Sequence, residues 1–144
     1  MLPLPPPTFE VRRAVAADGK LRVEAHLASP RGALYAGLVL PTKRALSMMV
    51  NGKAPPKQES KNLVAKLLAA GGWVNLMVCD TGTEGADYAL EFSGTQPVDA
   101  YVWDATFGLP EAGAALAAAR PASSVPFQVG DVTTVLRPIR LEAR

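Results

Sequence analysis

The sequence predicts one mostly β domain, an antiparallel β-sandwich of the jelly-roll or immunoglobulin-like kind. Three observations support this fold class. Apolar and polar residues alternate with a period of two along most of the chain, which is typical of strands with one buried face. Turn-forming pairs such as Asp18-Gly19 and Asn51-Gly52 separate the alternating stretches. A chain of 144 residues has the size of one domain and can bury a core without disulfides.

Seven or eight short strands are expected, because strand-like stretches recur between turn signals. They cover residues 9–15, 21–27, 33–40, 45–50, 73–79, 88–92, 98–103 and 132–141. The first two flank Asp18-Gly19 and are predicted to pair as a hairpin. Pro138 in the last stretch indicates an edge strand or a bulge, because proline cannot donate a hydrogen bond to a neighbouring strand.

Two segments are compatible with more than one structure. Residues 63–68 have helical spacing of leucine and valine, but Gly71-Gly72 follows closely, so a short helix and a strand both fit. Residues 110–119 begin with a proline suited to a first helical turn. Their many alanines give no amphipathic face, so a short helix and a partly ordered loop both fit.

Residues 1–8 are predicted to be a proline-rich linker, so that the sandwich covers residues 9–144. Prolines occupy four of the six positions from Leu2 to Pro7, which excludes a helix or a central strand there. Such a segment favours an extended polyproline spacer of the kind found between domains. We therefore expect the chain to be a piece of a longer protein, with a native proline-rich start as the alternative.

Composition and charge exclude several functional classes. The net charge is +2 and the fifteen basic residues are scattered, so no nucleic-acid surface is predicted. No apolar run approaches the ~20 residues that span a bilayer, so this segment is not expected to insert into a membrane. His26 and Cys79 are the only histidine and the only cysteine. They leave too few ligands and bases for a zinc site or a Ser-His-Asp triad, and Cys79 is expected to be a small core residue.

The carboxylates do not change this interpretation. Asp80, Glu84 and Asp87 cluster around one turn, where a weakly bound calcium ion is an alternative to a solvated loop. Their spacing matches no EF-hand, so the solvated loop is favoured. Asp104 and Asp131 are expected at strand ends, where they would cap turns. The sequence thus predicts no catalytic residue, no metal site and no cofactor.

Aromatic residues provide the candidate binding surface, which consists of Tyr101, Trp103, Asp104 and Phe107. Tyr101 and Trp103 share one face of a predicted strand. If they face solvent, they form a surface for a sugar or a peptide. Packing beneath the segment 104–122 is the alternative, and it is favoured.

Several segments of the second half resemble a known family. They are Tyr88-Ala-Leu-Glu-Phe-Ser-Gly, Pro97-Val-Asp-Ala-Tyr-Val-Trp-Asp, Gly108-Leu-Pro110, Arg120-Pro-Ala-Ser-Ser and Gly130-Asp-Val-Thr-Thr-Val-Leu-Arg137. Together they cover roughly residues 73–141 and resemble the segment that ends certain bacterial membrane-bound peptidases of family M28. These peptidases are relatives of the endoplasmic reticulum metallopeptidases.

The resemblance implies a soluble C-terminal β domain that follows a zinc aminopeptidase domain and several membrane helices. Such a domain would be periplasmic or extracytoplasmic, tethered through the upstream helices. The zinc ligands belong to the peptidase domain, and none can be assigned to a residue of this chain. The resulting hypothesis is a non-catalytic accessory domain that positions or gates the catalytic domain of the same polypeptide. An independent carbohydrate- or peptide-binding module is the alternative, and a small enzyme using His26 or Asp131 is a weaker one.

Overall fold

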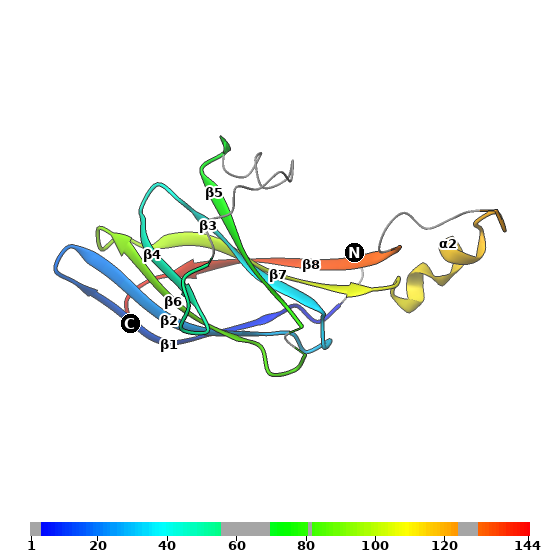
Figure 1. Ribbon diagram of the computed structural model, residues 1–144, viewed down its shortest axis with the longest axis horizontal. Coiled ribbons are helices and arrows are strands. Elements are labelled where there is room, and N and C mark those ends of the chain that lie inside the picture. Colours follow the sequence, from blue (N-terminus) through cyan, green and yellow to red (C-terminus); the bar gives the residue numbers. More distant parts are fainter. Residues whose placement is uncertain (1–3, 56–69, 81, 124–129) are drawn as a thin grey trace.

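The alternating stretches of the chain pair into two antiparallel sheets that pack face to face. The computed structural model describes residues 4–55, 70–80, 82–123 and 130–144. Sheet A has the strand order β1-β2-β6-β4, and sheet B has the order β5-β3-β7-β8 (Figure 1). The strands are β1 (Thr8–Ala17), β2 (Lys20–Ala28), β3 (Tyr35–Pro41), β4 (Ala45–Val50), β5 (Trp73–Cys79), β6 (Ala86–Ser93), β7 (Val98–Phe107) and β8 (Val132–Leu141). The predicted β-sandwich is confirmed.

The strand order is that of an immunoglobulin-like sandwich rather than a jelly roll. The order β1-β2-β6-β4 corresponds to the A-B-E-D sheet of that fold, and β3-β7-β8 corresponds to its C-F-G sheet. Strand β5 is an additional strand that pairs with β3. In sequence, β5 lies between β4 and β6, which both belong to sheet A. The chain therefore crosses from sheet A to sheet B and back between these two strands.

Most of the predicted elements are present with bounds close to those expected. Strands β1 and β2 pair around Asp18-Gly19, where both residues have the positive φ that such a turn needs. Strand β7 continues past residue 103 to Phe107. Residues 110–119, which fitted either a short helix or a partly ordered loop, form a 3₁₀ turn, η1 (Glu111–Gly113), followed by a short helix, α2 (Ala114–Ala118). Residues 63–68, whose structure was open between helix and strand, lie outside the described part of the chain.

Two local features of the chain ends follow from proline. Strand β1 begins at Thr8, and Pro7 before it is buried. Within the described residues, β8 pairs with β7 alone, and Pro138 lies opposite Tyr101. The prediction of an edge strand from Pro138 is therefore confirmed, since a proline in an edge strand can direct its missing amide away from the sheet.

The core lies between the two sheets and consists of side chains from both inner faces. Tyr88 and Phe92 are the largest fully buried side chains of sheet A, and Leu38 and Leu40 are among the largest of sheet B. The hydroxyl of Tyr88 donates a hydrogen bond across the core to the carbonyl oxygen of Leu76 at 3.0 Å. Burial raises the pKa of the Tyr88 phenol. Each buried leucine or phenylalanine contributes about 1.5–3 kcal/mol relative to exposure, so this layer holds the sheets together.

Candidate binding surface

The outer face of sheet B carries apolar and aromatic side chains where a solvated sheet would normally carry polar ones. Five of the nine aromatic residues of the chain lie on it. They are Tyr35, Trp73, Tyr101, Trp103 and Phe107. Their positions follow from the strand register, since residues directly opposite one another in adjacent strands share a face. Met77, Gly37, Trp103 and Leu136 form one such row across all four strands.

This face contains most of the large exposed apolar side chains of the described residues. Large exposed side chains on it are Met77 (50%), Phe107 (50%), Leu136 (58%), Val132 (39%) and Tyr101 (37%). A side chain of this kind offers roughly 150–250 Å², so the exposed part of the five amounts to about 400 Å². Apolar patches of about 300–600 Å² are the largest found on typical monomers and are often functional.

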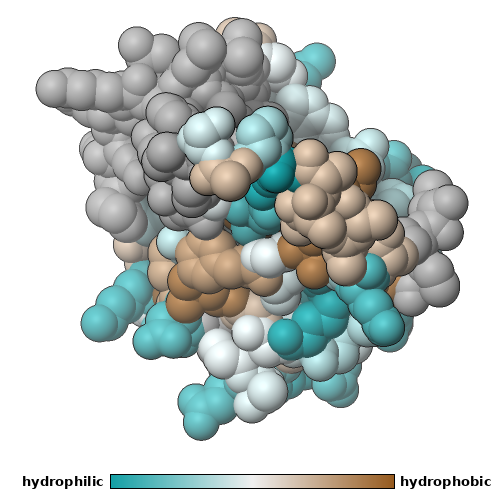
Figure 2. Space-filling view, turned by 90° about the vertical axis from the view of Figure 1, so that its right-hand side faces the viewer, coloured by the Kyte–Doolittle hydropathy of each residue, from teal (hydrophilic) through white to brown (hydrophobic). Residues whose placement is uncertain are grey.

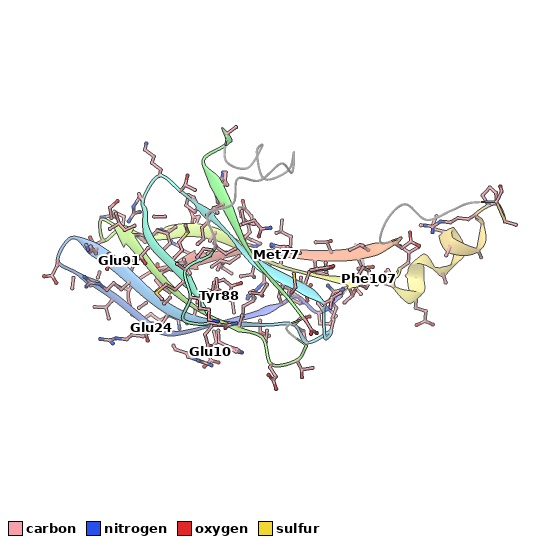
Figure 3. The ribbon with its side chains drawn as sticks, in the orientation of Figure 1. Glu10, Glu24, Met77, Tyr88, Glu91 and Phe107 are labelled. Atoms are coloured by element: carbon pink, nitrogen blue, oxygen red, sulfur yellow. The ribbon has the colours of Figure 1, made fainter. Side chains whose placement is uncertain are left out.

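The figures show the extent of the patch. Figure 3 places Met77 on β5 and Phe107 near the end of β7 that faces α2. Figure 2 looks onto that end of the molecule, with α2 nearest the viewer, and shows apolar and polar surface side by side there. Helix α2 itself lies beyond the end of the sandwich rather than over sheet B (Figure 1). The patch therefore continues from an edge strand to the end of the sheet.

Trp103 is held at the centre of this face by its neighbours. Its indole lies across Gly37, where an added Cβ would be 2.6 Å from Nε1 and 2.8 Å from Cε2. The indole Nε1 donates a hydrogen bond to Asn75 Oδ1 at 2.9 Å. Because any side chain at position 37 would occupy the space of the ring, glycine is required there for this arrangement. The ring is thus fixed before any partner arrives.

Two further aromatic pairs flank Trp103. The rings of Trp73 and Tyr101 lie 5.9 Å apart at an interplanar angle of 56°. The rings of Tyr35 and Phe107 lie 6.0 Å apart at 85°. Edge-to-face and tilted pairs of this kind contribute about 0.5–1.5 kcal/mol each beyond their burial. Because the rings of each pair are inclined to one another, the aromatic surface is uneven rather than flat.

Charged residues lie only at the ends of this surface. Within the described part of sheet B, the charged residues of the outer face are Asp99 and Arg140, which form an ion pair of 3.2 Å. At the opposite end, Arg120 donates two hydrogen bonds, of 2.6 and 2.7 Å, to the carboxylate of Asp131. This pairing lowers the pKa of Asp131. The centre of the face is therefore uncharged.

The structure brings together three of the four predicted surface residues. Tyr101, Trp103 and Phe107 share the outer face of sheet B. Asp104 does not belong to this surface, and its prediction is wrong. Because β7 continues to Phe107, Asp104 is not at a strand end, and alternation turns its side chain inward. It is fully buried.

Asp104 is instead the centre of a buried polar network at one end of the sandwich. Its carboxylate forms an ion pair with Arg31 and accepts a hydrogen bond from Ser29 Oγ at 2.5 Å. Ser29 Oγ in turn accepts hydrogen bonds from the backbone N–H groups of Arg31 and Ala33, at 3.3 and 3.2 Å. Arg31 also donates to Thr106 Oγ1 at 3.3 Å. This network joins the β2–β3 connection to β7.

The sequence analysis misplaced some residues of this surface and missed others. Tyr101 contacts Trp73 and is partly exposed, so it does not pack beneath the segment 104–122, which was the arrangement that the sequence analysis favoured. Cys79 is exposed on the outer side of β5, and the prediction of a core position is wrong. Met77 and Leu136 were also missed. The signal in the sequence was that residues 73–79 are uncharged on both faces, which is unusual for a strand with one solvated side.

The outer face of sheet A has the opposite character. Lys20 and Arg22 each donate a hydrogen bond of 2.8 Å to the carboxylate of Glu91, and these bonds lower its pKa. Asp87 accepts from His26 Nδ1 at 2.6 Å and from Arg12 at 3.0 Å. The bond from His26 and the neighbouring Arg12 guanidinium lower the pKa of Asp87.

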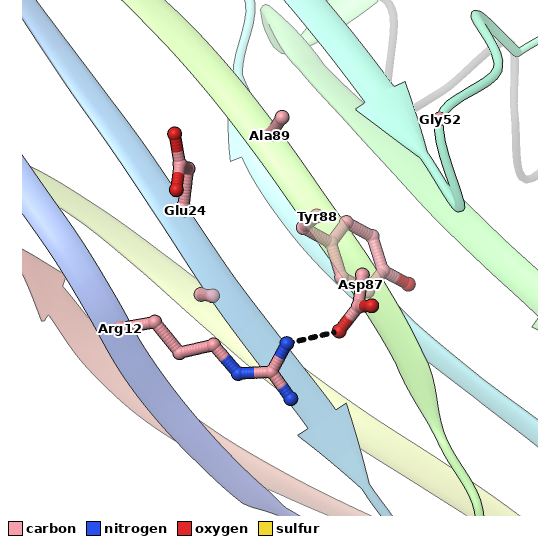
Figure 4. Close-up of a pocket in the computed structure, with 7 residues that line it drawn as sticks. Arg12, Glu24, Gly52, Asp87, Tyr88 and Ala89 are labelled. Carbon is pink, nitrogen blue, oxygen red and sulfur yellow. Dashed lines mark hydrogen bonds and ion pairs between the residues drawn. The ribbon is translucent and has the colours of Figure 1, made fainter.

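A shallow hollow of about 210 Å³ lies on this charged face (Figure 4). Arg12 reaches across β2 to Asp87 at its rim, and Glu24 and Gly52 line it. Among the described residues, no hydroxyl or thiol side chain bonds His26. Its Nε2 faces Gly85, where an added Cβ would lie only 2.9 Å away.

The described residues hold no group of three or more His, Cys, Asp or Glu side chains placed to bind a metal ion. Asp87, one of the three carboxylates that suggested a calcium site, is paired with His26 and Arg12 instead. In the part of the chain that is described, no helix has the length and apolar character needed to cross a bilayer. The chain matches no protein-family model, no curated protein and no solved structure.

Proposed function

We propose that this chain is a non-catalytic accessory domain that docks onto another protein domain through the outer face of sheet B. The difference between the two outer faces carries this proposal. The face of sheet A is covered with paired charges, whereas that of sheet B is apolar and uncharged at its centre. Both sheets share one core, so the apolar outer face is not needed to close the fold. Its composition is explained by a partner that covers it.

The occupant we favour is a protein surface. Cores of protein interfaces are enriched in Tyr, Trp, Phe and Met and depleted of Lys, Glu and Asp, as this face is. Trp and Tyr are also the residues that most often dominate binding energy. Trp103, held over Gly37 and bonded to Asn75, is a preorganised anchor of this type. Such an anchor loses little conformational freedom on binding, which favours affinity.

The resemblance to the end of M28 peptidases suggests which domain that partner is. Under this proposal the occupant is the zinc aminopeptidase domain of the same polypeptide, on the extracytoplasmic side of a membrane. The sandwich would position that domain or restrict access to it, since a rigid sheet held by one face fixes the orientation of whatever it contacts. No residue of this chain would take part in the chemistry.

The test is binding to the purified zinc aminopeptidase domain of a bacterial M28 peptidase. Leu136→Lys places a charge beside Trp103 on the apolar face and should weaken binding at least tenfold, because a lysine would be desolvated there without a partner. Glu24→Lys on sheet A is the matched control and should leave binding unchanged. Equal binding by the wild type and Leu136→Lys would refute the proposal.

A carbohydrate- or peptide-binding module is the second candidate, and the partly exposed Trp73–Tyr101 pair favours it. Its tilt of 56° gives two ring planes rather than one platform, which suits a peptide side chain better than a flat sugar ring. Tryptophan fluorescence titrated with glycan and peptide panels distinguishes the two. Saturable quenching by a peptide or glycan, without binding of the peptidase domain, would support this second function.

A further inference from the structure

The free edges of the two sheets are not alike. Among the described residues the edge strands are β1, β4, β5 and β8. Natural edge strands avoid pairing with other chains by means of charge, proline or a bulge. Strand β1 has a shift in register between Val11 and Arg13, and β4 has one between Ala45 and Ser47. Strand β8 contains Pro138 and two arginines.

Strand β5 has none of these protections. Its sequence Trp-Val-Asn-Leu-Met-Val-Cys contains no charge and no proline, and all seven residues pair with β3 in unbroken register. Within the described chain, β3 is its one neighbour. A regular, uncharged edge of this length is a template for another strand.

The register shows which backbone groups of β5 are free. Thr42 N donates to Gly72 O at one end of the β3–β5 pair, and Asp80 N donates to Leu34 O at the other, both at 2.7 Å. In an antiparallel pair, hydrogen-bonded and non-hydrogen-bonded positions alternate. The even-numbered residues of β5 therefore bond to β3. The amides and carbonyls of the odd-numbered residues point to the free edge, and these are Trp73, Asn75, Met77 and Cys79.

We propose that β5 pairs with β5 of a second copy of this chain, antiparallel about a twofold axis that places Leu76 opposite Leu76. In this register all seven residues of each strand find a partner. Trp73 lies opposite Cys79 of the second copy, Asn75 opposite Met77, and Val74 opposite Val78. The odd-numbered residues meet as hydrogen-bonded pairs, as the free edge requires. The two sheets B become one continuous eight-stranded sheet.

Charge and polarity favour a second copy as the occupant. Each cross-strand pair in this register joins uncharged side chains, so no like charges meet. Val74 and Val78 are partly buried on the inner side of β5 and pack against the core. The same residues of the second copy would lie beside them and cover their exposed parts. Pairing through β1 or β8 would instead bring arginines of two copies together.

This inference does not depend on the proposed function, because it concerns the edge of sheet B and not its outer face. Met77→Pro tests it. The amide that proline removes points to the free edge, so pairing with β3 is kept while an added strand is blocked. The wild-type chain should sediment as a dimer at about 100 μM, and Met77→Pro as a monomer with unchanged far-UV circular dichroism.

Leu136→Pro is the matched control. Leu136 lies on the same outer face with similar exposure, and its alternation with Pro138 directs its amide to the opposite free edge. This variant should remain a dimer. A wild-type chain that is monomeric at about 100 μM would overturn the inference, as would a dimer that survives Met77→Pro. A dimer broken by Leu136→Pro but not by Met77→Pro would place the contact elsewhere.

A disulfide tests the register even where Met77→Pro fails to fold. In Trp73→Cys, the new thiol lies opposite Cys79 of the second copy, at the ~5.5 Å Cα separation that a disulfide accepts. The two cysteines of one chain are about 20 Å apart along the strand, so any bond between them joins two copies. Mild oxidation should give covalent dimers. Leu136→Cys is the control, and equal cross-linking of both variants would refute the register.

Discussion

Replacing Gly37 with alanine tests whether Trp103 is fixed by the surface that surrounds it. Glycine inside a strand is ordinarily less stable than alanine by about 0.5–1 kcal/mol, so the exchange would be stabilising at an unobstructed position. Here the new Cβ would lie 2.6 Å from Trp103 Nε1 and 2.9 Å from Asn75 Oδ1. The indole must therefore move away from the sheet.

The cost of that movement exceeds the gain. Inserting a methyl group into a packed site costs about 1–3 kcal/mol. Breaking the hydrogen bond between Trp103 and Asn75 costs a further ~1 kcal/mol. After subtraction of the strand propensity, Gly37→Ala should destabilise the protein by about 1–3 kcal/mol. For a domain of this size the corresponding fall in Tm is roughly 3 °C per kcal/mol.

Urea unfolding in a Trp73→Phe background measures this effect, because Trp103 is then the one tryptophan of the chain. Its emission in the folded state should also shift to longer wavelength in Gly37→Ala as the ring becomes exposed. The matched control compares Trp103→Ala with and without Gly37→Ala, followed by far-UV circular dichroism because no tryptophan remains; here the obstruction is gone and alanine should be neutral or stabilising. If alanine costs the same free energy with and without the indole, the reasoning is refuted.

Three further predictions concern the polar contacts. Asp104→Asn leaves Arg31 buried without its counter-ion and should cost about 3–5 kcal/mol in urea unfolding, whereas Asp99→Asn at the exposed pair with Arg140 should cost under ~1 kcal/mol. Arg44 donates to four carbonyl oxygens of residues 93–97, and Arg44→Lys, which cannot form this fork, should lower stability by about 1 kcal/mol and speed amide exchange at Gly94. The pKa values of Asp87, Glu91 and Asp131 are lowered by folding, so the unfolded chain takes up protons first on acidification. Stability should be constant above about pH 5 and fall below the ordinary carboxyl pKa near 4, and Glu91→Gln should reduce that fall in thermal melts; an unchanged slope would contradict this assignment.

The spans of the strands could be predicted because they depend on short-range chemistry. Asp18-Gly19 provides the positive φ of a hairpin turn, and Pro138 excludes a central position, whatever surrounds them. The polar face of β2, which carries His26, could also be assigned, since its opposite face is uniformly apolar. These features depend only on residues that are close together in the sequence.

The candidate surface depended on tertiary structure. Along β7 both faces are apolar over residues 100–103, so alternation defines two faces without saying which is covered. Sheet A covers the face of Val102 and Asp104, which buries Asp104 against Arg31 and leaves Tyr101 outside. Cys79 is exposed because it lies on the outer face of β5, which sheet A does not cover.

The sequence by itself thus determined the β-sandwich class and the approximate spans of its strands. Only the packing of the two sheets decided where its apolar excess lies. A period of two separates the sides of a strand, but the choice of the buried side is made by the strands that pair with it and by the sheet that covers it. Those contacts join residues as distant in sequence as Gly37 and Trp103, and no local pattern records them.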